Sequence, residues 1–510
     1  MQYSARRDLI DDLLLPTLLF VALGGMTWAV RGCSGFGASV GCIFAGVMWG
    51  AAWWFIAREP GREPSRRYTS GWIVLAVTAG MGIAGARGWM QWPSFFEGKM
   101  LTNYGAGESV PISRWYGFLW LFIAGVPWAG ISACLLAWCG SLHTTRLGHW
   151  LIRLACGIGA AYLARWLFYA YPQYFLPMYE AFEDRYRDIE HNPNLRRLTN
   201  DCGAAIMHLG LYLGLLAYEF LRRDGKNVVL ISTVGVVNGA GWAACQNWKW
   251  APGVWPNASF NWWRCWESSG GLSIGLAFGI AYFLVNGRMS AAERTEVRAR
   301  RAIAGPNLEW LAVYLLLTSL FGFLLLSAPR FWGRVYFATT IVFGIAYYLL
   351  RRNAYDRQPA PEYEAYGDPN LERWALRVGS LYGLGISLRA GLKGWFNIYR
   401  GNEDYYSALL WQYFGPVFFL LLIGICVCAL FWPVARNFRG DLFPHAGWLV
   451  ALVLVQQNII AQLITGPLDQ WNEAAFSIYY ALLFAITVPI VLYYARMQRM
   501  GMPALASVAG

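Results

Sequence analysis

Long apolar segments recur along the whole chain, and short polar connections separate them. Each segment holds about 20 residues, the length at which an α-helix crosses the hydrocarbon core of a bilayer. The longest connection, 172–200, is too short to form a domain of its own. The apolar segments are 13–30, 36–57, 71–91, 115–140, 149–171, 201–221, 228–246, 270–287, 308–327, 332–350, 374–393, 406–432, 447–465 and 475–495.

This alternation predicts an all-α polytopic membrane protein with about 14 transmembrane helices. Successive helices would pair as seven in-out-in helical hairpins, with both termini on one side of the membrane. We expect residues 1–510 to form a single integral membrane domain. The predicted hairpins are 10–57, 71–140, 149–221, 228–287, 308–350, 374–432 and 447–497.

Composition and charge agree with this class and give it an orientation. Hydrophobic residues make up 57% of the chain and charged residues 14%, well outside the range of soluble domains. Lys and Arg are about twice as frequent in the connections on the side of the termini, which predicts cytoplasmic N- and C-termini. The net charge of +12 follows from this distribution, so no nucleic-acid partner is expected. The chain shows no organelle signal, and the expected location is the inner (plasma) membrane.

Several outward-running segments end in similar motifs, such as GGMTWAVRG at 24–32, GMGIAGARGW at 80–89 and GISLRAGLKGW at 385–395. A stripe of small residues leads to a cation or an amide, often followed by Gly and Trp. Small residues let membrane helices approach closely, so the stripe alone predicts packing. The ionisable groups are candidates for function, although a long Arg stem near a helix end can also reach the interface.

The outer connections that follow these motifs carry aromatic rings beside carboxylates, as in FNIYRGNED at 396–404 and GPLDQWNE at 466–473. If the hairpins pack around a common axis, these connections meet at one outer face. Aromatic faces with amides and carboxylates suit a sugar or polyol, and the cations suit an anionic group. Any single Trp, and pairs such as Trp53–Trp54, also suit an aromatic belt at the lipid headgroups.

A substrate site rich in Trp, Arg and Glu is therefore predicted on the outer side. Arg389 and Lys393 share a helix face, where they repel each other unless an anion or a carboxylate lies between them. The candidate substrate-binding residues are Arg31, Arg87, Trp89, Trp92, Glu97, Gln246, Asn247, Trp248, Glu267, Arg389, Lys393, Trp395, Glu403, Asn458 and Glu473.

Other polar residues allow two interpretations. Amides within segments, at 456–458 and at Asn238, need partners inside the bundle and would serve as structural links or as solute contacts. Glu219 is predicted to form a surface pair with the neighbouring Arg222 and Arg223. Cys245 and Cys265 flank an outer connection, where either a disulfide or two free thiols would fit.

Motifs for several chemistries are missing from the sequence. The chain contains no HExxH, GxSxG, Walker A or CxxC motif, and His208 is the one histidine in the interior of an apolar segment. Because membrane haem sites usually use paired histidines, a cytochrome is not expected. The sequence predicts neither a metal site nor another cofactor.

Two functions fit these patterns. The first is a permease or transporter for a small polar, anionic or sugar-like solute, with membrane lipid as its other partner. The alternative is a membrane-embedded transferase or hydrolase that acts on a sugar or lipid-linked substrate at the outer face. In that enzyme, Glu97, Glu267 and Glu403 would act as acid and base. A structural subunit without a ligand is a third option.

Overall fold

The structure is a computed structural model that describes most of the first 301 residues and the C-terminal helix. The described residues are 8–33, 38–58, 65–85, 92–103, 105–140, 147–188, 195–245, 248, 250–258, 260–301, 454, 461 and 471–500. Apart from residues 454 and 461, the predicted segments between 308 and 465 lie outside the described residues.

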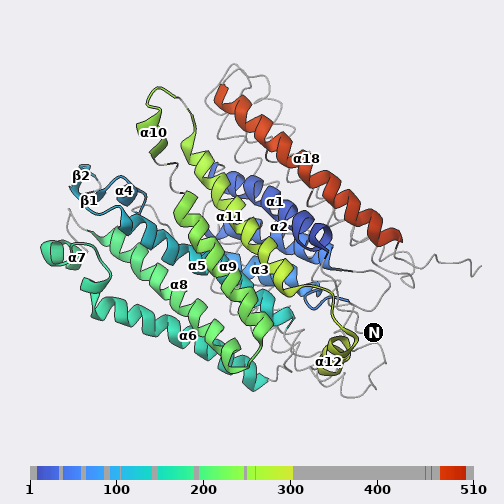
Figure 1. Ribbon diagram of the computed structural model, residues 1–510. Helices are drawn as coiled ribbons and strands as arrows, with labels where there is room; N and C mark the ends of the chain where they lie inside the picture. The colour runs from blue at the N-terminus through green and yellow to red at the C-terminus, as the bar shows by residue number, and fades with distance from the viewer. Residues whose placement is uncertain are drawn as a thin grey trace, which may run out of the picture.

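The described chain is helical, apart from one short β-hairpin, and its long helices lie roughly side by side (Figure 1). Those long and apolar enough to span a membrane are Leu9–Gly32, Trp115–Cys139, Leu151–Ala170, Arg196–Leu221, Gly225–Cys245, Trp262–Val285 and Trp471–Met497. Two shorter apolar helices, Gly41–Ala57 and Trp72–Ala84, lie among them. The prediction of a multi-pass, all-α membrane protein is confirmed for this part of the chain.

Six of the described helices pack as a closed ring, in the order α1, α2, α3, α5, α9, α11 and back to α1. Outside the ring, α8 packs against α5 and α6 packs on α8, while α18 packs against α1. The bounds in the ring are α1 (Leu15–Cys33), α2 (Ala38–Ala57), α3 (Trp72–Ala84), α5 (Trp115–Cys139), α9 (Gly225–Cys245) and α11 (Trp262–Val285). The outer helices are α6 (Leu147–Ala170), α8 (Arg196–Leu221) and α18 (Trp471–Met500).

Small residues set the closest helix contacts. A Cβ at Gly24 of α1 would overlap the carbonyl oxygen of Gly271 in α11, so the two backbones touch there. On the outer pair, Gly214 of α8 lies in the same way against the backbone of Cys156 in α6. This is the close approach that small residues permit between membrane helices, and it explains the stripe of small residues in α1.

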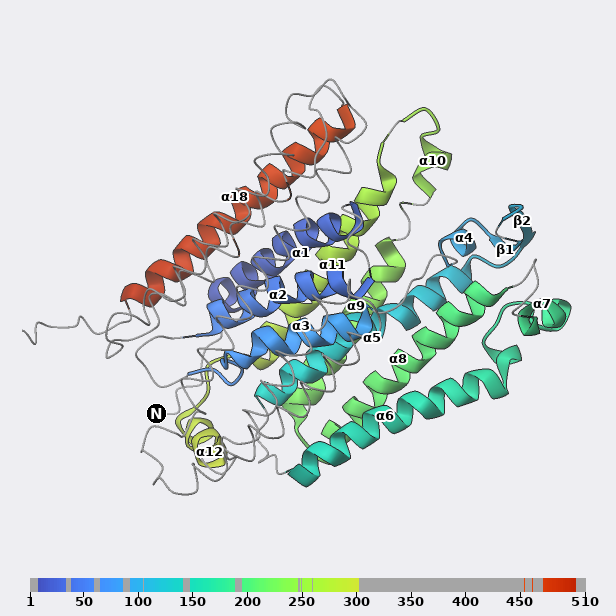
Figure 2. The same ribbon diagram turned by 180° about the vertical axis from the view of Figure 1, so that it is seen from behind.

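Connections gather at two ends of the bundle (Figure 2). One end, which we call the β-hairpin end, carries the strands and several short helices. It contains α4 (Trp92–Phe96), β1 (Lys99–Asn103), β2 (Glu108–Pro111), η2 (Pro172–Tyr174), η3 (Glu180–Phe182), α7 (Glu183–Arg187) and α10 (Ala251–Val254). The opposite end carries η1 (Leu9–Leu14), residues 65–71, residues 222–224 and α12 (Ala291–Arg301).

The antiparallel pairing of β1 and β2 was not predicted, because the sequence analysis treated this region as a loop. Lys99 pairs with Pro111 and Met100 with Val110. Gly98 and Gly107 adopt φ angles of 79° and 70°, which favour glycine at the two bends of the chain. Trp92 of α4 stacks on Trp120 of α5 with ring centroids 5.8 Å apart, which docks this region on the bundle.

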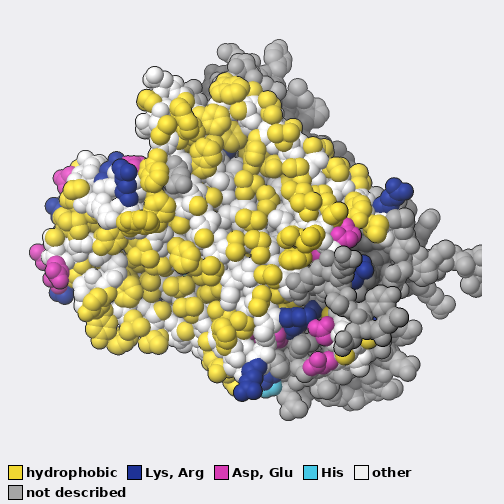
Figure 3. Space-filling view, viewed as in Figure 1, with side chains coloured by type: hydrophobic (Ala, Val, Ile, Leu, Met, Phe, Trp, Pro, Cys, Tyr) yellow, Lys and Arg dark blue, Asp and Glu magenta, His cyan; other side chains and the backbone are white. Residues whose placement is uncertain are grey.

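The outer surface of the described bundle is apolar over its middle, and charged side chains gather toward its ends (Figure 3). Helix α6 contributes large exposed apolar side chains along its length, including Leu151, Ile158, Leu163 and Trp166. Such a surface is stable in lipid and costly in water. The chain is therefore an integral, multi-pass membrane protein.

Candidate functional site

The ring encloses a buried ion pair between the last turn of α1 and the second turn of α11. Arg31 Nη1 lies 3.0 Å from Glu267 Oε2. Arg31 is 4% exposed and Glu267 is 2% exposed, so both charges are removed from solvent and lipid. Isolated charges in such a place are costly, and the pairing offsets part of that cost. The pair lies within about two turns of the β-hairpin end.

Tryptophan rings surround the guanidinium of Arg31. Its Cζ atom lies 4.6 Å from the ring centroid of Trp28 and 5.7 Å from that of Trp128. Trp242 completes the group, with its ring centroid 4.4 Å from that of Trp128 and 6.2 Å from that of Trp28. The ring faces stabilise the cation through their quadrupoles. We call Arg31, Glu267, Trp28, Trp128 and Trp242 the paired cage.

A glycine makes room for this ion pair. A Cβ at Gly32 would overlap Cγ and Cδ of Glu267. The Arg-Gly step at the end of α1 therefore supplies both the cation and the space in which its carboxylate partner lies. This gives a physical role to the glycine that follows the cation in the repeated motif.

Two small hollows border the paired cage. The first has a cavity volume of about 10 Å³ and is lined by cage residues together with Cys245, Trp266 and Gly270. The second has a cavity volume of about 20 Å³ between α3, α5 and α8, and its lining includes Trp128, Asp201 and His208. Each has room for about one water molecule and is far smaller than the roughly 300–1,000 Å³ of typical ligand pockets. Trp128 borders the second hollow and packs on Trp242, which borders the first, so this ring pair separates the two hollows.

A second buried ion pair joins α11 to α18 near the β-hairpin end. Arg264 Nη1 lies 2.7 Å from Glu473 Oε2, and its Cζ atom lies 4.7 Å from the ring centroid of Phe476. Asn261 accepts a hydrogen bond from the backbone N–H of Arg264 and so caps the start of α11. Glu473 therefore lies in a contact that docks α18, apart from the paired cage.

The other described candidates occupy different surroundings. Glu97 is partly exposed and binds Lys99, with Oε2 2.5 Å from Nζ. Trp92 is buried under α4, where its Nε1 donates a weak hydrogen bond to Cys202 Sγ. Trp248 is half-buried, and its Nε1 donates to Ser269 Oγ at 2.8 Å. Of the described candidate residues, Arg31 and Glu267 thus lie together in one ion pair, and the others lie apart from it.

More than half of the predicted site residues lie outside the described residues. These are Arg87, Trp89, Gln246, Asn247, Arg389, Lys393, Trp395, Glu403 and Asn458.

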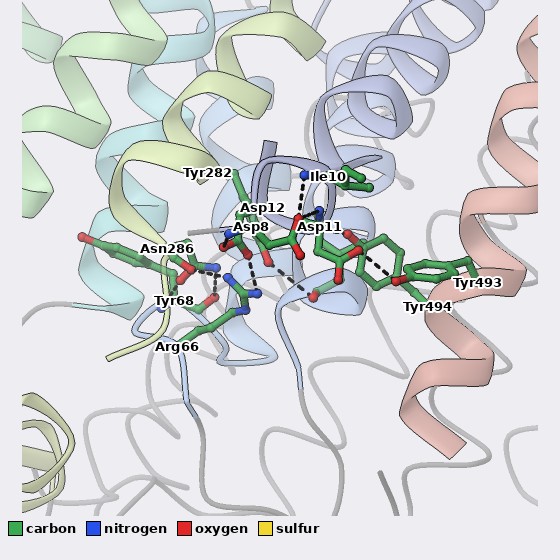
Figure 4. Close-up of polar contacts among 11 residues, drawn as sticks. Asp8, Ile10, Asp11, Asp12, Arg66, Tyr68, Tyr282, Asn286, Tyr493 and Tyr494 are labelled. Atoms are coloured by element: carbon green, nitrogen blue, oxygen red, sulfur yellow. Dashed lines mark hydrogen bonds and ion pairs between the residues drawn. The ribbon is translucent and has the colours of Figure 1, made fainter. Parts of the chain in front are cut away.

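At the opposite end, a buried polar network contains residues that the sequence analysis did not select (Figure 4). Arg66 lies between α2 and α3. Its Nη2 donates to Asp12 Oδ1 at 2.6 Å, and its Nη1 donates to the carbonyl of Asn286 at 2.7 Å. Tyr494 of α18 donates its hydroxyl to the carbonyl of Asp11 at 2.8 Å. These contacts join η1, the connection between α2 and α3, the end of α11 and the last turns of α18.

The network continues from the neighbouring residues Arg67 and Tyr68. Arg67 Nη2 lies 2.6 Å from both carboxylate oxygens of Asp224. The Tyr68 hydroxyl donates to Asn227 Oδ1 at 2.6 Å, and Asn227 Nδ2 donates to Glu219 Oε2 at 2.9 Å. Burial raises the pKa of the Tyr68 hydroxyl well above its usual range, so it remains a donor.

This network corrects the prediction for Glu219. Glu219 is fully buried and pairs with Arg153 of α6, with Oε1 2.7 Å from Nη2. The surface pair with Arg222 and Arg223 is therefore wrong. Arg66, Arg67 and Arg153 were treated as connection charges, yet each is buried beside a carboxylate. Asp12 and Asp224, next to apolar segments, were the sequence signal that could have pointed to such partners.

Three other interpretations are decided by the packing. Trp53 and Trp54 lie in the core with no exposed surface, and Trp53 Nε1 donates to the carbonyl of Tyr68, so the belt assignment for this pair is wrong. Cys245 and Cys265 are both free thiols, so no disulfide joins them. Asn238 donates to the carbonyl of Gly125 at 2.6 Å, which makes it a link between α9 and α5.

Within the described ranges, no three His, Cys, Asp or Glu side chains gather as metal ligands. The chain matches no protein-family model, and neither a curated protein nor a solved structure matches it. The arguments for function therefore rest on the geometry alone.

Proposed function

We propose that this chain is a permease for a small polar, anionic or sugar-like solute, and that the paired cage holds part of that solute. We further propose that the β-hairpin end faces the outer, periplasmic side of the inner membrane and that both termini are cytoplasmic. The orientation is supported by the excess of Lys and Arg in the connections at the opposite end.

The observation that carries this proposal is the buried pair of Arg31 and Glu267 inside a closed ring of helices. Ionisable groups within membrane helices are rare, pair with one another and are candidates for substrate and ion pathways. Structural ion pairs occur elsewhere in this bundle, but among the pairs described only this one lies inside a cage of tryptophans and beside two hollows.

The chemistry of Arg31 suits exchange of its Glu267 partner for an anionic group of the solute. Arg31 Nε is buried and makes no hydrogen bond to any described residue, so the guanidinium has donor capacity left for a carboxylate or phosphate oxygen. Glu267 would then accept hydrogen bonds from hydroxyl groups of the same solute. The faces of Trp28 and Trp242 suit the CH groups of a sugar ring or a short carbon chain.

The opposite end of the bundle supports the same function. The network of Arg66, Asp12 and Asn286 ties η1, the end of α11 and the connection between α2 and α3 together there, far from the paired cage. A permease needs contacts at the two ends that can open separately, because its site faces one side of the membrane at a time. The separate ion pairs at the two ends support the proposal in this respect.

The described residues give the enzyme alternative no comparable support, and its third candidate, Glu403, lies outside them. A pair of catalytic carboxyl groups must flank one reacting bond. Glu97 pairs with Lys99 in the connection after α4, whereas Glu267 pairs with Arg31 inside the ring. The two carboxylates thus occupy different environments and share no contact.

A binding screen on the purified full-length protein tests the proposal. Thermal unfolding is measured with sugar acids, sugar phosphates, sulfated sugars, neutral sugars and dicarboxylates, for wild type and for Glu267→Gln. Glu97→Gln serves as the matched control, because it removes a carboxylate at the partly exposed connection. We expect a compound that raises the unfolding temperature of wild type and of Glu97→Gln but not of Glu267→Gln. Equal stabilisation of all three would show that the paired cage does not hold the solute.

A further inference from the structure

Helix α6 carries an arginine on the surface that faces lipid. Of the candidate membrane spans in the described part of the chain, Leu151–Ala170 of α6 is the least buried, and α6 packs on α8 at the edge of the bundle (Figure 2). Arg165 is exposed on this helix, which ends at Ala170. At the helical rise of about 1.5 Å per residue, the Cα atom of Arg165 lies roughly 7.5 Å from that end. Its long stem can reach the lipid headgroups from this depth, and its charge requires an anion or water there.

Aromatic side chains share the exposed face of α6 with Arg165. Positions 162, 165, 166 and 169 are spaced by three and four residues, which places their side chains on one face of a helix. Tyr162 is 67% exposed, Trp166 58% and Tyr169 47%, so this face points away from the bundle. Trp and Tyr gather at the level of the headgroups in membrane proteins. We call Tyr162, Arg165, Trp166 and Tyr169 the α6 patch.

The contacts of Arg165 leave most of its hydrogen-bonding groups available. Its Cζ atom lies 5.5 Å from the ring centroid of Tyr169, and its Nη1 lies 3.9 Å from the sulfur of Met207 in α8. A thioether is a weak acceptor, whereas a guanidinium has five N–H donors. Among the described residues, no carboxylate pairs with Arg165.

Other cations at the β-hairpin end differ from Arg165 in this respect. Lys99, Arg185 and Arg187 are each paired with a glutamate. These pairs lie in the connections beyond the helices, where water also solvates the charges. Arg165 combines a position on the lipid-facing surface with the lack of a carboxylate partner in the described part of the chain.

We propose that the α6 patch binds the headgroup of an anionic phospholipid in the leaflet at the β-hairpin end, with Arg165 holding the lipid phosphate. A guanidinium offers two parallel N–H groups that match two oxygens of a phosphate. The Tyr169 ring lies against the guanidinium and orients it. An anionic headgroup is preferred over a zwitterionic one, because it brings no ammonium group that would repel the guanidinium.

The charge of the patch favours a lipid over a second copy of the chain. A symmetric dimer through this face would bring the same patch of both copies to one interface. Two guanidinium groups would then approach each other without a carboxylate from either patch. The lipid site lies outside the ring of helices and is independent of the solute that we place in the paired cage.

Native mass spectrometry of the purified full-length protein tests the site. The protein is placed in micelles that contain equal amounts of phosphatidylglycerol and phosphatidylcholine with the same acyl chains, and the retained lipids are counted. Wild type is compared with Arg165→Gln and with Arg187→Gln. Arg187 is the matched control, because it is an exposed arginine at the same end whose Nη2 lies 2.6 Å from Glu183 Oε1. We expect Arg165→Gln to retain one phosphatidylglycerol fewer than the other two proteins, with no change in phosphatidylcholine.

Equal phosphatidylglycerol counts in wild type and Arg165→Gln would overturn the lipid site. A protein dimer that loses no phosphatidylglycerol on this substitution would overturn it as well and would assign the face to a second copy of the chain.

Photolabelling then locates the lipid on the protein. Phosphatidylglycerol and phosphatidylcholine that carry the same photoactivatable acyl chain are added to wild type and to Arg165→Gln, and the labelled peptides are identified. In wild type, phosphatidylglycerol should label residues 158–174 at least threefold more than phosphatidylcholine does, and Arg165→Gln should lose this preference. Equal labelling of wild type by the two lipids would mean unspecific lipid contact and would overturn the proposal. Should Arg165→Gln fail to fold, this comparison in wild type decides the question.

Discussion

Arg31 and Glu267 are separated by 236 positions in the chain, yet Arg31 Nη1 lies 3.0 Å from Glu267 Oε2 inside the ring of helices. The contact exists because α1 and α11 approach closely enough for the backbones of Gly24 and Gly271 to touch. Two features of the sequence, a stripe of small residues and a cation at the end of the helix, thus act together. The small residues bring α1 and α11 into contact, and the cation at the end of α1 then pairs with a carboxylate of α11.

Removing one partner of the pair should destabilise the protein more than removing both. Arg31→Met leaves the Glu267 carboxylate buried without its cation, and loss of one member of a buried pair costs about 3–5 kcal/mol. Arg31→Met combined with Glu267→Leu removes both charges and should recover most of that loss. The unfolding temperatures of the two single variants and the double variant measure the coupling. Additive effects would mean that the two side chains do not interact.

Gly32→Ala should impair solute binding although every charge remains in place. The added Cβ would overlap the side chain of Glu267 and displace its carboxylate from Arg31. Gly159→Ala on α6 is the matched control, because nothing lies within 4 Å of a Cβ there. It should be neutral or stabilise the helix by up to about 1 kcal/mol. Thermal shift with the screened compound checks both variants, and equal binding by both would contradict the role given to Gly32.

Arg66→Gln should loosen the opposite end of the bundle. The substitution removes the charge that faces Asp12 and weakens the tie to the end of α11. We expect faster amide hydrogen exchange in residues 8–14 and in the last turns of α18, which contact each other through Tyr494 and Asp11. Exchange in α5 should not change. Arg223→Gln, at an exposed position, provides the control, and protection that persists in Arg66→Gln would argue against a bridging role for Arg66.

Docking of α12 should weaken in acid. Glu293 is partly exposed; its partial burial favours the neutral form, but hydrogen bonds from Lys226 and Ser290 outweigh this and lower the pKa of its carboxyl. A lowered folded-state pKa means that the stabilisation is complete above the ordinary carboxyl range and is lost as the pH falls through the folded value. The effect is small, at most about 1 kcal/mol, because the pair is screened by solvent and salt.

Amide exchange of α12, corrected for the intrinsic pH dependence, measures this effect between neutral pH and about pH 3. Glu293→Gln should show no such dependence and should resemble the acid form at every pH. Identical pH profiles for the two proteins would exclude the Glu293 carboxyl as the cause.

The sequence was sufficient for the class of protein and for most helix positions in the described part, because about 20 apolar residues in a row are long enough to span a bilayer as a helix, whose backbone groups are all paired there. The sequence did not indicate which charged residues pair with each other. Glu267 was predicted as a site residue, and Arg31 too, but their pairing depends on contact between distant helices. Arg66 and Arg67 were misjudged since a count of connection charges treats every Arg alike, whereas burial depends on Asp12 and Asp224 elsewhere in the chain.

The aromatic residues show the same limit. Trp53 and Trp54 lie near the end of an apolar segment, which is where belt residues occur, yet α2 belongs to the ring and both rings face the core. Trp28, Trp128 and Trp242 come from three different helices, and no local pattern indicates that they meet around one guanidinium. Their association follows from the order of helices in the ring, which sequence periodicity does not encode.

Solute movement across a membrane is the most direct test of the permease. The full-length protein is reconstituted into liposomes, and uptake of the radiolabelled compound from the binding screen is followed for wild type, Glu267→Gln and Glu97→Gln. If the chain is a permease with its site at the paired cage, wild type and Glu97→Gln accumulate the unchanged compound, and Glu267→Gln does not. Binding without uptake, or recovery of a chemically altered compound, would contradict the permease and favour an enzyme at the same face.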